Sequence, residues 1–242
     1  MRVPWRRLRY AGDSAILLEF AHTIDPTASR VLHSTAAAVR GAAIEGMWGI
    51  VPAYASLLLE FDPLVVSGPQ VAEALESLDI TITSPPPRLF EVPVAYGGAF
   101  GPDLEAVAAG AGISPEAVVA AHTAQPYLIY CIGFAPGFPM CGTLPDALHL
   151  ARRSSPRTAV PAGSVAIAGA QTGIYPLRSP GGWHLLGRTP ARLFHLDREP
   201  PVSYRPGDFL QFRSVDEATF AELERVVAAG FEVVREVAGA QD

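Results

Sequence analysis

The stretch from Pro156 to Pro190 limits what this chain can fold into more than any other part of the sequence. Two short apolar pieces, Ser164–Ala168 and His184–Leu186, alternate there with turns that contain six glycines. Glycine adopts positive φ and lets other backbone approach closely, so such turns can aim backbone N–H groups at a ligand. Tight glycine turns are equally typical of a small β-barrel. The pattern therefore predicts turn-rich β structure, with or without a binding site in its turns.

Arginine is concentrated in the same part of the chain. Residues 151–200 hold seven arginines against two acidic residues, a local charge of +5, whereas the whole chain carries a net charge of −6. A basic patch on an acidic protein indicates a site for a small anion rather than for nucleic acid, which favours a broadly basic surface. Guanidinium groups match carboxylate and phosphate oxygens, and this makes Arg157 and Arg188 candidate catalytic residues.

The composition excludes several classes of site. The chain has no lysine, which excludes a Schiff-base lysine and a Walker-type phosphate loop. Cys131 and Cys141 are too few for a zinc site, and we expect both to be buried free thiols. No apolar run approaches the about 20 residues that cross a bilayer, and no signal core follows the basic start. We therefore expect a soluble, cytoplasmic protein with no metal site of its own.

The first part of the chain has the pattern of a small α+β sandwich of the ferredoxin-like type. Alternating apolar residues predict five strands: Leu8–Tyr10, Ala15–Phe20, Ile44–Val51, Ser56–Phe61 and Ile80–Ile82. Two helices are predicted between them, one capped by Asp25 and stopped by Gly41, the other running from Gln70 to Leu78. The proline-rich linker Ser84–Pro87 is the predicted boundary, which gives domains at 1–84 and 85–242.

The second part of the chain has many short strands separated by Gly and Pro turns, the pattern of a β-barrel. The predicted strands are Phe90–Val94, Tyr127–Phe134, Ser164–Ala168, Leu193–Leu196, Asp208–Phe212 and Phe231–Val234. Helices are predicted over Asp103–Ala109 and Glu116–His122, and after a capping box at Ser214–Glu217. The expected fold is thus an α+β domain followed by a mainly-β barrel domain that contains the ligand site.

The turn-rich stretch supplies further candidates for ligand contact. Its glycines alternate with side chains that carry donors or aromatic faces. The candidate ligand-binding residues are Gln171, Tyr175, Ser179, Gly181, Gly182 and Trp183. His122 ends a predicted helix, where the dipole favours a protonated ring, and it suits a structural role as well as a catalytic one. These residues support an anion-binding site and, by themselves, no named reaction.

A series of motifs identifies a family. In order they are Gly12–Ser14, Val51–Ser56, Gly101–Leu104, Gly133–Phe138, Val160–Val165, Gln171–Pro176, Ser179–Trp183 and Gly187–Pro190. Taken together, they resemble the KipI / PxpB family, which comprises the B subunits of 5-oxoprolinase and is also called allophanate hydrolase subunit 1 or carboxyltransferase subdomain C/D. The resemblance covers nearly the whole chain, and Met140-Cys141 departs from the family's usual pattern.

The resemblance carries expectations about fold and activity. It implies a ferredoxin-like domain followed by a cyclophilin-like barrel, without prolyl isomerase activity. It implies a non-autonomous subunit of an ATP-hydrolysing 5-oxoprolinase, which opens 5-oxoproline to L-glutamate together with a KipA-like C subunit and a LamB/YcsF-like A subunit. ATP would be a co-substrate, with Mg²⁺ as a helper. His122, Arg157 and Arg188 would act in catalysis.

Two other functions stay open on the sequence. One is a KipI-like regulatory protein that inhibits a sensor histidine kinase. The other is a carboxyltransferase-type subunit of a urea carboxylase or allophanate hydrolase system.

Overall fold

The computed structural model describes residues 4–82 and 85–237. The chain divides into two compact units, Met1–Pro86 and Pro87–Asp242, and each is described by itself. The linker predicted at the domain boundary begins at Ser84, which lies outside the described residues.

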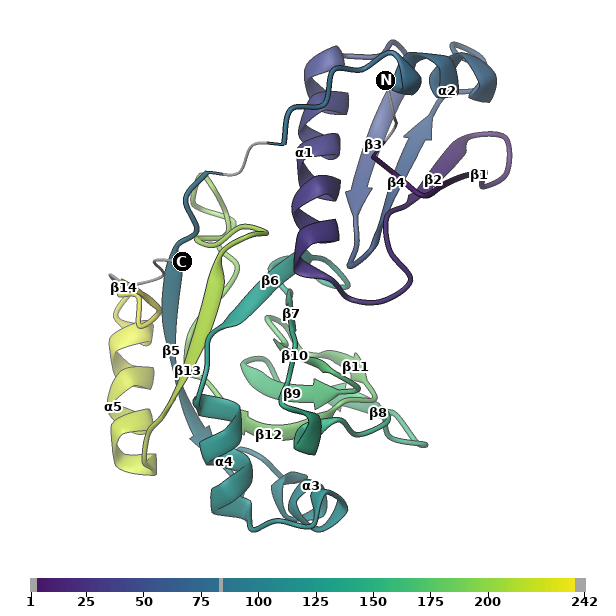
Figure 1. Ribbon diagram of the computed structural model, residues 1–242. Coiled ribbons are helices and arrows are strands. Elements are labelled where there is room, and N and C mark those ends of the chain that lie inside the picture. The colour runs from purple at the N-terminus through teal and green to yellow at the C-terminus, as the bar shows by residue number, and fades with distance from the viewer. Residues whose placement is uncertain (1–3, 83–84, 238–242) are drawn as a thin grey trace. The chain divides into compact units, whose positions relative to one another are not determined.

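The first unit is an antiparallel four-stranded sheet packed against two helices, α1 (Pro26–Ala42) and α2 (Gly68–Glu76) (Figure 1). Its strands are β1 (Arg7–Tyr10), β2 (Ala15–Glu19), β3 (Met47–Pro52) and β4 (Ser56–Phe61), in the order β1-β2-β4-β3. Alternate residues along β2 and β4 are fully buried and form one core with the helices. That core includes Ile16, Leu18, Leu57, Leu59, Leu32, Val39, Val71 and Leu75.

The ends of the helices and strands in this unit agree only in part with those predicted from the sequence. Asp25 caps α1 as predicted, because its carboxylate accepts the Ala28 N–H at 2.7 Å. The helix continues past Gly41 to Ala42 and is capped by Ala43, whose φ of 46° is left-handed, so the predicted stop was wrong. The predicted strand Ile80–Ile82 was also wrong, and these residues are irregular. The edge beside β2, where a ferredoxin-like last strand would pair, is already occupied by β1.

The second unit contains a closed seven-stranded β-barrel, which confirms the predicted barrel. Its strands are β5 (Leu89–Tyr96), β6 (Tyr127–Ile132), β7 (Pro139–Gly142), β9 (Ser164–Ala168), β10 (Gln171–Ile174), β12 (His184–Arg188) and β13 (Phe209–Ser214). Their order is β12-β9-β10-β7-β6-β13-β5, and pairing of β12 with β5 closes the barrel. β5 and β13 are parallel, and the other pairs of the barrel are antiparallel.

Smaller elements complete the barrel unit. They are β14 (Arg235–Val237), which pairs with β5, a separate pair formed by β8 (Arg157–Val160) and β11 (Ser179–Gly181), the helices α3 (Leu104–Ala111), α4 (Pro115–Thr123) and α5 (Glu217–Ala228), and the short 3-10 helix η1 (Asp146–Leu148). Within the described residues, no single helix is long and apolar enough to cross a membrane; α3 and α4 pass that test only as a pair bent by 91°.

Three predicted features of this unit were wrong. Leu193–Leu196 is irregular, and the last strand is β14 rather than Phe231–Val234. The N-cap of α5 is Asp216, which accepts the Thr219 N–H at 2.7 Å. Ser214 cannot take that place because it still belongs to β13.

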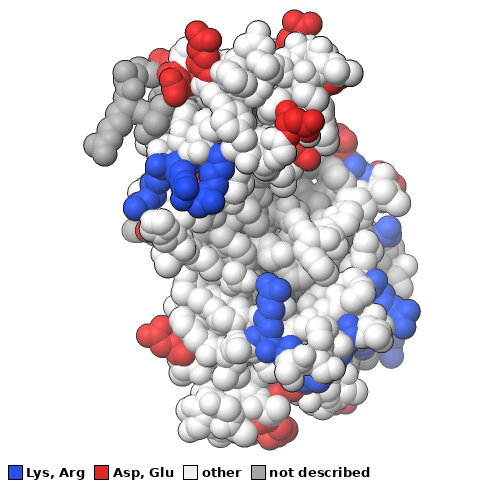
Figure 2. All heavy atoms as spheres, turned by 90° about the vertical axis from the view of Figure 1, so that its right-hand side faces the viewer, with Lys and Arg blue, Asp and Glu red and all other residues white. Residues whose placement is uncertain are grey.

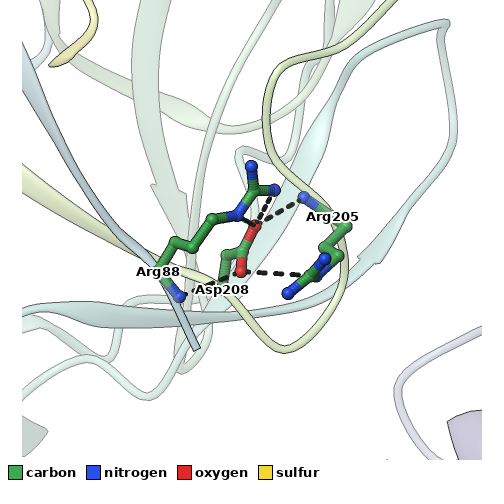
Figure 3. Close-up of polar contacts among 3 residues, drawn as sticks. All are labelled: Arg88, Arg205 and Asp208. Atoms are coloured by element: carbon green, nitrogen blue, oxygen red, sulfur yellow. Dashed lines mark hydrogen bonds and ion pairs between the residues drawn. The ribbon is translucent and has the colours of Figure 1, made fainter. Parts of the chain in front are cut away.

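A buried carboxylate joins the starts of the two parallel strands (Figure 3). Asp208, which directly precedes β13, is completely buried and accepts four hydrogen bonds. Three come from Arg88, through its backbone N–H at 3.1 Å, Nε at 3.1 Å and Nη2 at 2.6 Å, and one comes from the Arg205 N–H at 2.9 Å. Arg88 directly precedes β5, so Asp208 fixes where the β5–β13 pair begins.

Candidate functional site

A second buried carboxylate organises the arginine-rich part of the barrel unit. Asp103 is 4% exposed. Its Oδ1 accepts hydrogen bonds from Arg153 Nη1 at 3.0 Å and Arg157 Nη2 at 2.7 Å, and its Oδ2 accepts the Leu185 N–H at 2.7 Å. Burial alone raises the pKa of Asp103, but the hydrogen bonds from Arg157 and Leu185 and the charges of both arginines lower that pKa overall. Two guanidinium groups thus share one ionised carboxylate, with a net charge of +1.

The close approach of α3 to β12 places Asp103 in this position. The backbone of Gly101 lies against the Leu186 carbonyl, where any side chain would collide. Two residues later the Asp103 N–H donates to the Leu185 carbonyl at 3.1 Å, while its carboxylate accepts the Leu185 N–H. The Gly101–Leu104 motif therefore positions the carboxylate that binds both arginines.

Part of the hydrogen-bonding capacity around Asp103 is unused. Arg153 Nε, Arg157 Nη1 and Ser179 Oγ are buried and have no hydrogen-bond partner among the described residues. A buried donor without a partner costs about 1–3 kcal/mol, so such groups are rare in native structures. Two of the three groups belong to the arginine pair on Asp103, and we take them as the candidate contacts for an acceptor-rich ligand. On the face shown in Figure 2, several arginine side chains lie on the lower part, over the barrel.

The glycine-rich segment lies alongside this cluster. β11 pairs with β8 so that Gly181 is opposite Arg157, and a side chain at Gly181 would collide with the Tyr175 hydroxyl. Burial raises the pKa of Tyr175, while the Trp183 backbone and the charges of nearby arginines act in the opposite direction. The Gly182 carbonyl accepts the Arg153 N–H at 2.9 Å. The structure thus brings together six of the sequence candidates: Arg157, Tyr175, Ser179, Gly181, Gly182 and Trp183.

His122 lies in the barrel interior, away from solvent. It is completely buried, with Nδ1 2.8 Å from the Tyr96 hydroxyl and Nε2 2.8 Å from Thr172 Oγ1. The Thr172 hydroxyl donates to the Ala166 carbonyl at 3.2 Å, so His122 Nε2 donates to Thr172 and Nδ1 accepts from Tyr96. Burial lowers the pKa of His122 to about 3, and the protonated ring expected from the helix dipole was wrong. The geometry gives His122 a structural role.

Gln171 also lies apart from the cluster. It begins β10, where it pairs with Gly142 and Ala168. Tyr175 follows four residues later, about 13 Å away along an extended chain. Gln171 therefore lies at the opposite end of β10 from Tyr175.

The guanidinium of Arg188 packs against aromatic rings, one of them on α5, and does not bind Asp103. It ends β12, and its guanidinium lies over the rings of Phe100, 5.0 Å from the centroid, and Phe220, 5.3 Å from the centroid. Phe220 is a buried residue of α5. Cation–π contacts of this kind link α5 to the barrel, so Arg188 and Arg157, the two predicted catalytic arginines, have different partners.

Replacing Arg188 with alanine is expected to lower the free energy of unfolding by about 1–2 kcal/mol, since it removes two cation–π contacts and the packing of the side-chain stem. Chemical denaturation measures the change, and Arg188→Lys should lose less because the charge and stem remain. A variant of full stability that has lost activity would instead return Arg188 to the functional site.

A cavity of about 110 Å³ lies in another part of the barrel unit. It is lined by parts of 191–204 and 227–234, and neither Asp103 nor its two arginines line it. Two of its charged lining residues, Arg198 and Glu232, pair with one another. We therefore place the site at Asp103, where buried polar groups are unpaired.

Comparison with known proteins agrees with the motifs. Residues 6–204 match the sequence model described as the carboxyltransferase domain, subdomain C and D. The chain belongs to this family. It is 38% identical over 232 residues to the 5-oxoprolinase B subunit of Bacillus subtilis (strain 168), covering 88% of this chain and 95% of that protein. It is 52% identical over 128 residues to the 5-oxoprolinase B subunit of Escherichia coli O157:H7, covering 53% and 59% of the two chains.

Solved structures share the fold of this carboxyltransferase family member. The crystal structure of TTHA0988 in space group P212121 superposes with a TM-score of 0.75 at 40% identity, and the match covers 84% of this chain. It covers 40% of the TTHA0988 chain, so this chain spans well under half of that protein. The Kluyveromyces lactis urea amidolyase has a TM-score of 0.79 at 20% identity, covering 95% of this chain and 16% of that one, which shows the fold alone.

Asp103 and Arg153 were not among the sequence candidates. Asp103 is 54 residues from Arg157, and its local sequence indicates only a helix start. The motif Gly101–Leu104 was the one available signal, since it singled out the segment without giving the carboxylate a role.

Proposed function

We propose that this chain is the B subunit of a 5-oxoprolinase, a non-autonomous part of the enzyme that opens 5-oxoproline to L-glutamate with ATP hydrolysis. The observation that carries the proposal is the identity of 38–52% to three proteins named as 5-oxoprolinase B subunits. The cationic cluster at Asp103 supports it, because 5-oxoproline is an anion. The likeness to urea amidolyase, at 20% identity, does not favour a carboxyltransferase activity, and no observation favours the kinase regulator.

The chemistry of the reaction suits a site built from arginines. A lactam carbonyl is a poor electrophile, and transfer of the ATP γ-phosphoryl group to its oxygen would activate the carbonyl carbon for attack by water. Cleavage of the ring C–N bond, with the proton taken up by the nitrogen, then leaves γ-glutamyl phosphate. A second water molecule hydrolyses it to glutamate and phosphate. Such a transfer requires positioning and charge stabilisation more than covalent catalysis by the protein. In this proposal Arg153 and Arg157 hold an anionic oxygen of the substrate.

The cofactors and partners belong to the same proposal. Among the described residues no group of three or more His, Cys, Asp or Glu side chains is placed to hold a metal ion. Mg²⁺ bound with a nucleotide is held largely by phosphate oxygens and water, and we assign ATP and Mg²⁺ to no residue here. The relatives are named as one subunit of an enzyme, which supports a multi-subunit assembly. The partners would be a KipA-like C subunit and a LamB/YcsF-like A subunit, in the cytoplasm.

The finer description of the fold is also proposed. The order β2-β4-β3 with α1 and α2 supports a ferredoxin-like first unit in which β1 takes the place of the last strand. The closed barrel is compatible with a cyclophilin-like second unit.

The proposal is tested by phosphate release from ATP in a mixture of this chain with its KipA-like and LamB/YcsF-like partners, with and without 5-oxoproline. Arg157→Ala is expected to lower kcat/KM at least about 100-fold, the usual cost of removing one charge-stabilising donor from an active site. Arg178→Ala is the matched control, since Arg178 is an exposed arginine of the same stretch, and its activity should not change.

Two results would contradict parts of the proposal. Full activity of a folded Arg157→Ala variant would remove the arginine pair from the site. Phosphate release that does not depend on 5-oxoproline, in a complex that still assembles, would contradict the function itself.

A further inference from the structure

His184 adds an unpaired acceptor to the unpaired donors near Asp103. Its Nε2 lies 2.9 Å from the Ala151 carbonyl oxygen. A carbonyl oxygen only accepts, so Nε2 carries the hydrogen, and in the neutral ring Nδ1 is left as an acceptor. Nδ1 is buried and has no hydrogen-bond partner among the residues that the structure describes. The tautomer of His184 is thus fixed by the backbone, and the lone pair on Nδ1 is buried without a donor among these residues.

Backbone contacts place this acceptor beside the arginine pair. The segment from Gly182 to His184 runs along Ala151–Arg153, because the Arg153 N–H donates to the Gly182 carbonyl while His184 donates to Ala151. Leu185, the next residue, donates its N–H to Asp103. Arg153 itself binds the same carboxylate. Both neighbours of His184 are thus linked to Asp103, Leu185 directly and the Gly182 side through Arg153.

We propose that this cluster recognises a small molecule that carries both a carboxylate and an N–H group. The carboxylate binds to the unpaired Arg153 Nε and Arg157 Nη1, and the N–H donates to His184 Nδ1. The net charge of +1 on Asp103, Arg153 and Arg157 matches one carboxylate better than a dianionic phosphate. The inference rests on the proposed function, since 5-oxoproline, the lactam of glutamate, has one carboxylate and one ring N–H. In this inference His184 is the residue that distinguishes a lactam from an analogue without the ring N–H.

The distinguishing ligand is the lactone that has the same ring and carboxylate as 5-oxoproline but a ring oxygen in place of the N–H. That oxygen would bring a second lone pair against His184 Nδ1 and leave both acceptors unpaired. A site built for an N–H group rejects such an analogue because its buried partner stays unsatisfied. We expect the wild-type protein to bind 5-oxoproline about 10- to 100-fold more tightly than the lactone.

The test is isothermal titration calorimetry of the full chain, alone and in complex with its KipA-like and LamB/YcsF-like partners, with 5-oxoproline, the lactone and inorganic phosphate as separate ligands. In His184→Leu the preference for the lactam should fall below about threefold, because the acceptor is gone. His184→Gln should keep part of it, since its amide can both accept from the ligand and donate to Ala151. Arg157→Ala should weaken both organic ligands alike.

Several outcomes would overturn the inference. They are equal affinity of the wild type for lactam and lactone, a lactam preference that survives in His184→Leu, tighter binding of phosphate than of 5-oxoproline, and no binding of any of the three. The proposed function fails separately. A complex that binds the lactam selectively but releases no phosphate from ATP keeps this inference and loses the function, whereas turnover of 5-oxoproline without any role for His184 does the reverse.

Discussion

Replacing Asp208 with alanine is expected to lower the free energy of unfolding of the barrel unit by about 3–5 kcal/mol, the cost of breaking a buried ion pair from one side. Asp208 is fully buried, and the substitution leaves the Arg88 guanidinium and two backbone N–H groups without their acceptor. It also releases the starts of β5 and β13 from one another. Urea denaturation, followed by a signal from the barrel unit, measures the change.

A matched control comes from an exposed aspartate of the same unit. Asp146 has a fully exposed side chain, and Asp146→Ala should change the free energy of unfolding by less than about 0.5 kcal/mol. Arg88→Ala combined with Asp208→Ala should cost less than the sum of the single changes, because the two residues share the interaction that each variant removes. A loss below about 1 kcal/mol in Asp208→Ala would show that the cluster contributes little to stability.

Local patterns predicted those elements whose environment is set by neighbours in the chain. β4 (Ser56–Phe61) and β9 (Ser164–Ala168) form over the predicted residues. Each is a short apolar run bounded by turn residues, a pattern that few other local structures accommodate. The cap at Asp25 was predictable for the same reason, since its partner is three residues away. Signals of the first kind, short apolar runs between Gly and Pro turns, were sufficient to predict the barrel.

Apolar runs without such boundaries were ambiguous. Leu193–Leu196 has the composition of a strand, yet Leu193 is buried while Leu196 is 84% exposed. A core segment can bury single side chains without pairing its backbone, and periodicity over four residues does not distinguish this from a strand. Ile80–Ile82 failed for a different reason, because the neighbouring edge was taken by β1, a strand from the other end of the unit.

The candidate site shows most clearly what local sequence cannot predict. The composition of the stretch that contains Arg157 and Gly181 pointed to the correct segment, because excess arginine and glycine are local properties. The carboxylate that arranges the arginines comes from a helix start 54 residues away from Arg157. Nothing in the local sequence distinguishes Arg157 from Arg188. Only the tertiary structure shows that Arg157 binds Asp103, whereas Arg188 packs on the rings of Phe100 and Phe220.

Acidification is expected to destabilise the barrel unit through His122. The pKa of its ring is about 3 in the folded protein and about 6.5 in an unfolded chain. Between these values the unfolded state binds a proton that the folded state does not, so stability falls as pH decreases, by roughly 1.4 kcal/mol per pH unit once pH is well below 6.5. Above pH 6.5 this contribution is fully retained.

The dependence of the free energy of unfolding on pH distinguishes His122 from other titrating groups. Urea unfolding from pH 7.5 to pH 5 should show the slope in the wild type and in His22→Gln, an exposed histidine, and lose most of it in His122→Gln. The absolute stability of His122→Gln is less informative, because Tyr96 and Thr172 both lose a ring partner. Equal slopes in the wild type and in His122→Gln would mean that the folded barrel accepts a proton at His122, and the catalytic role expected for this residue would then have to be restored.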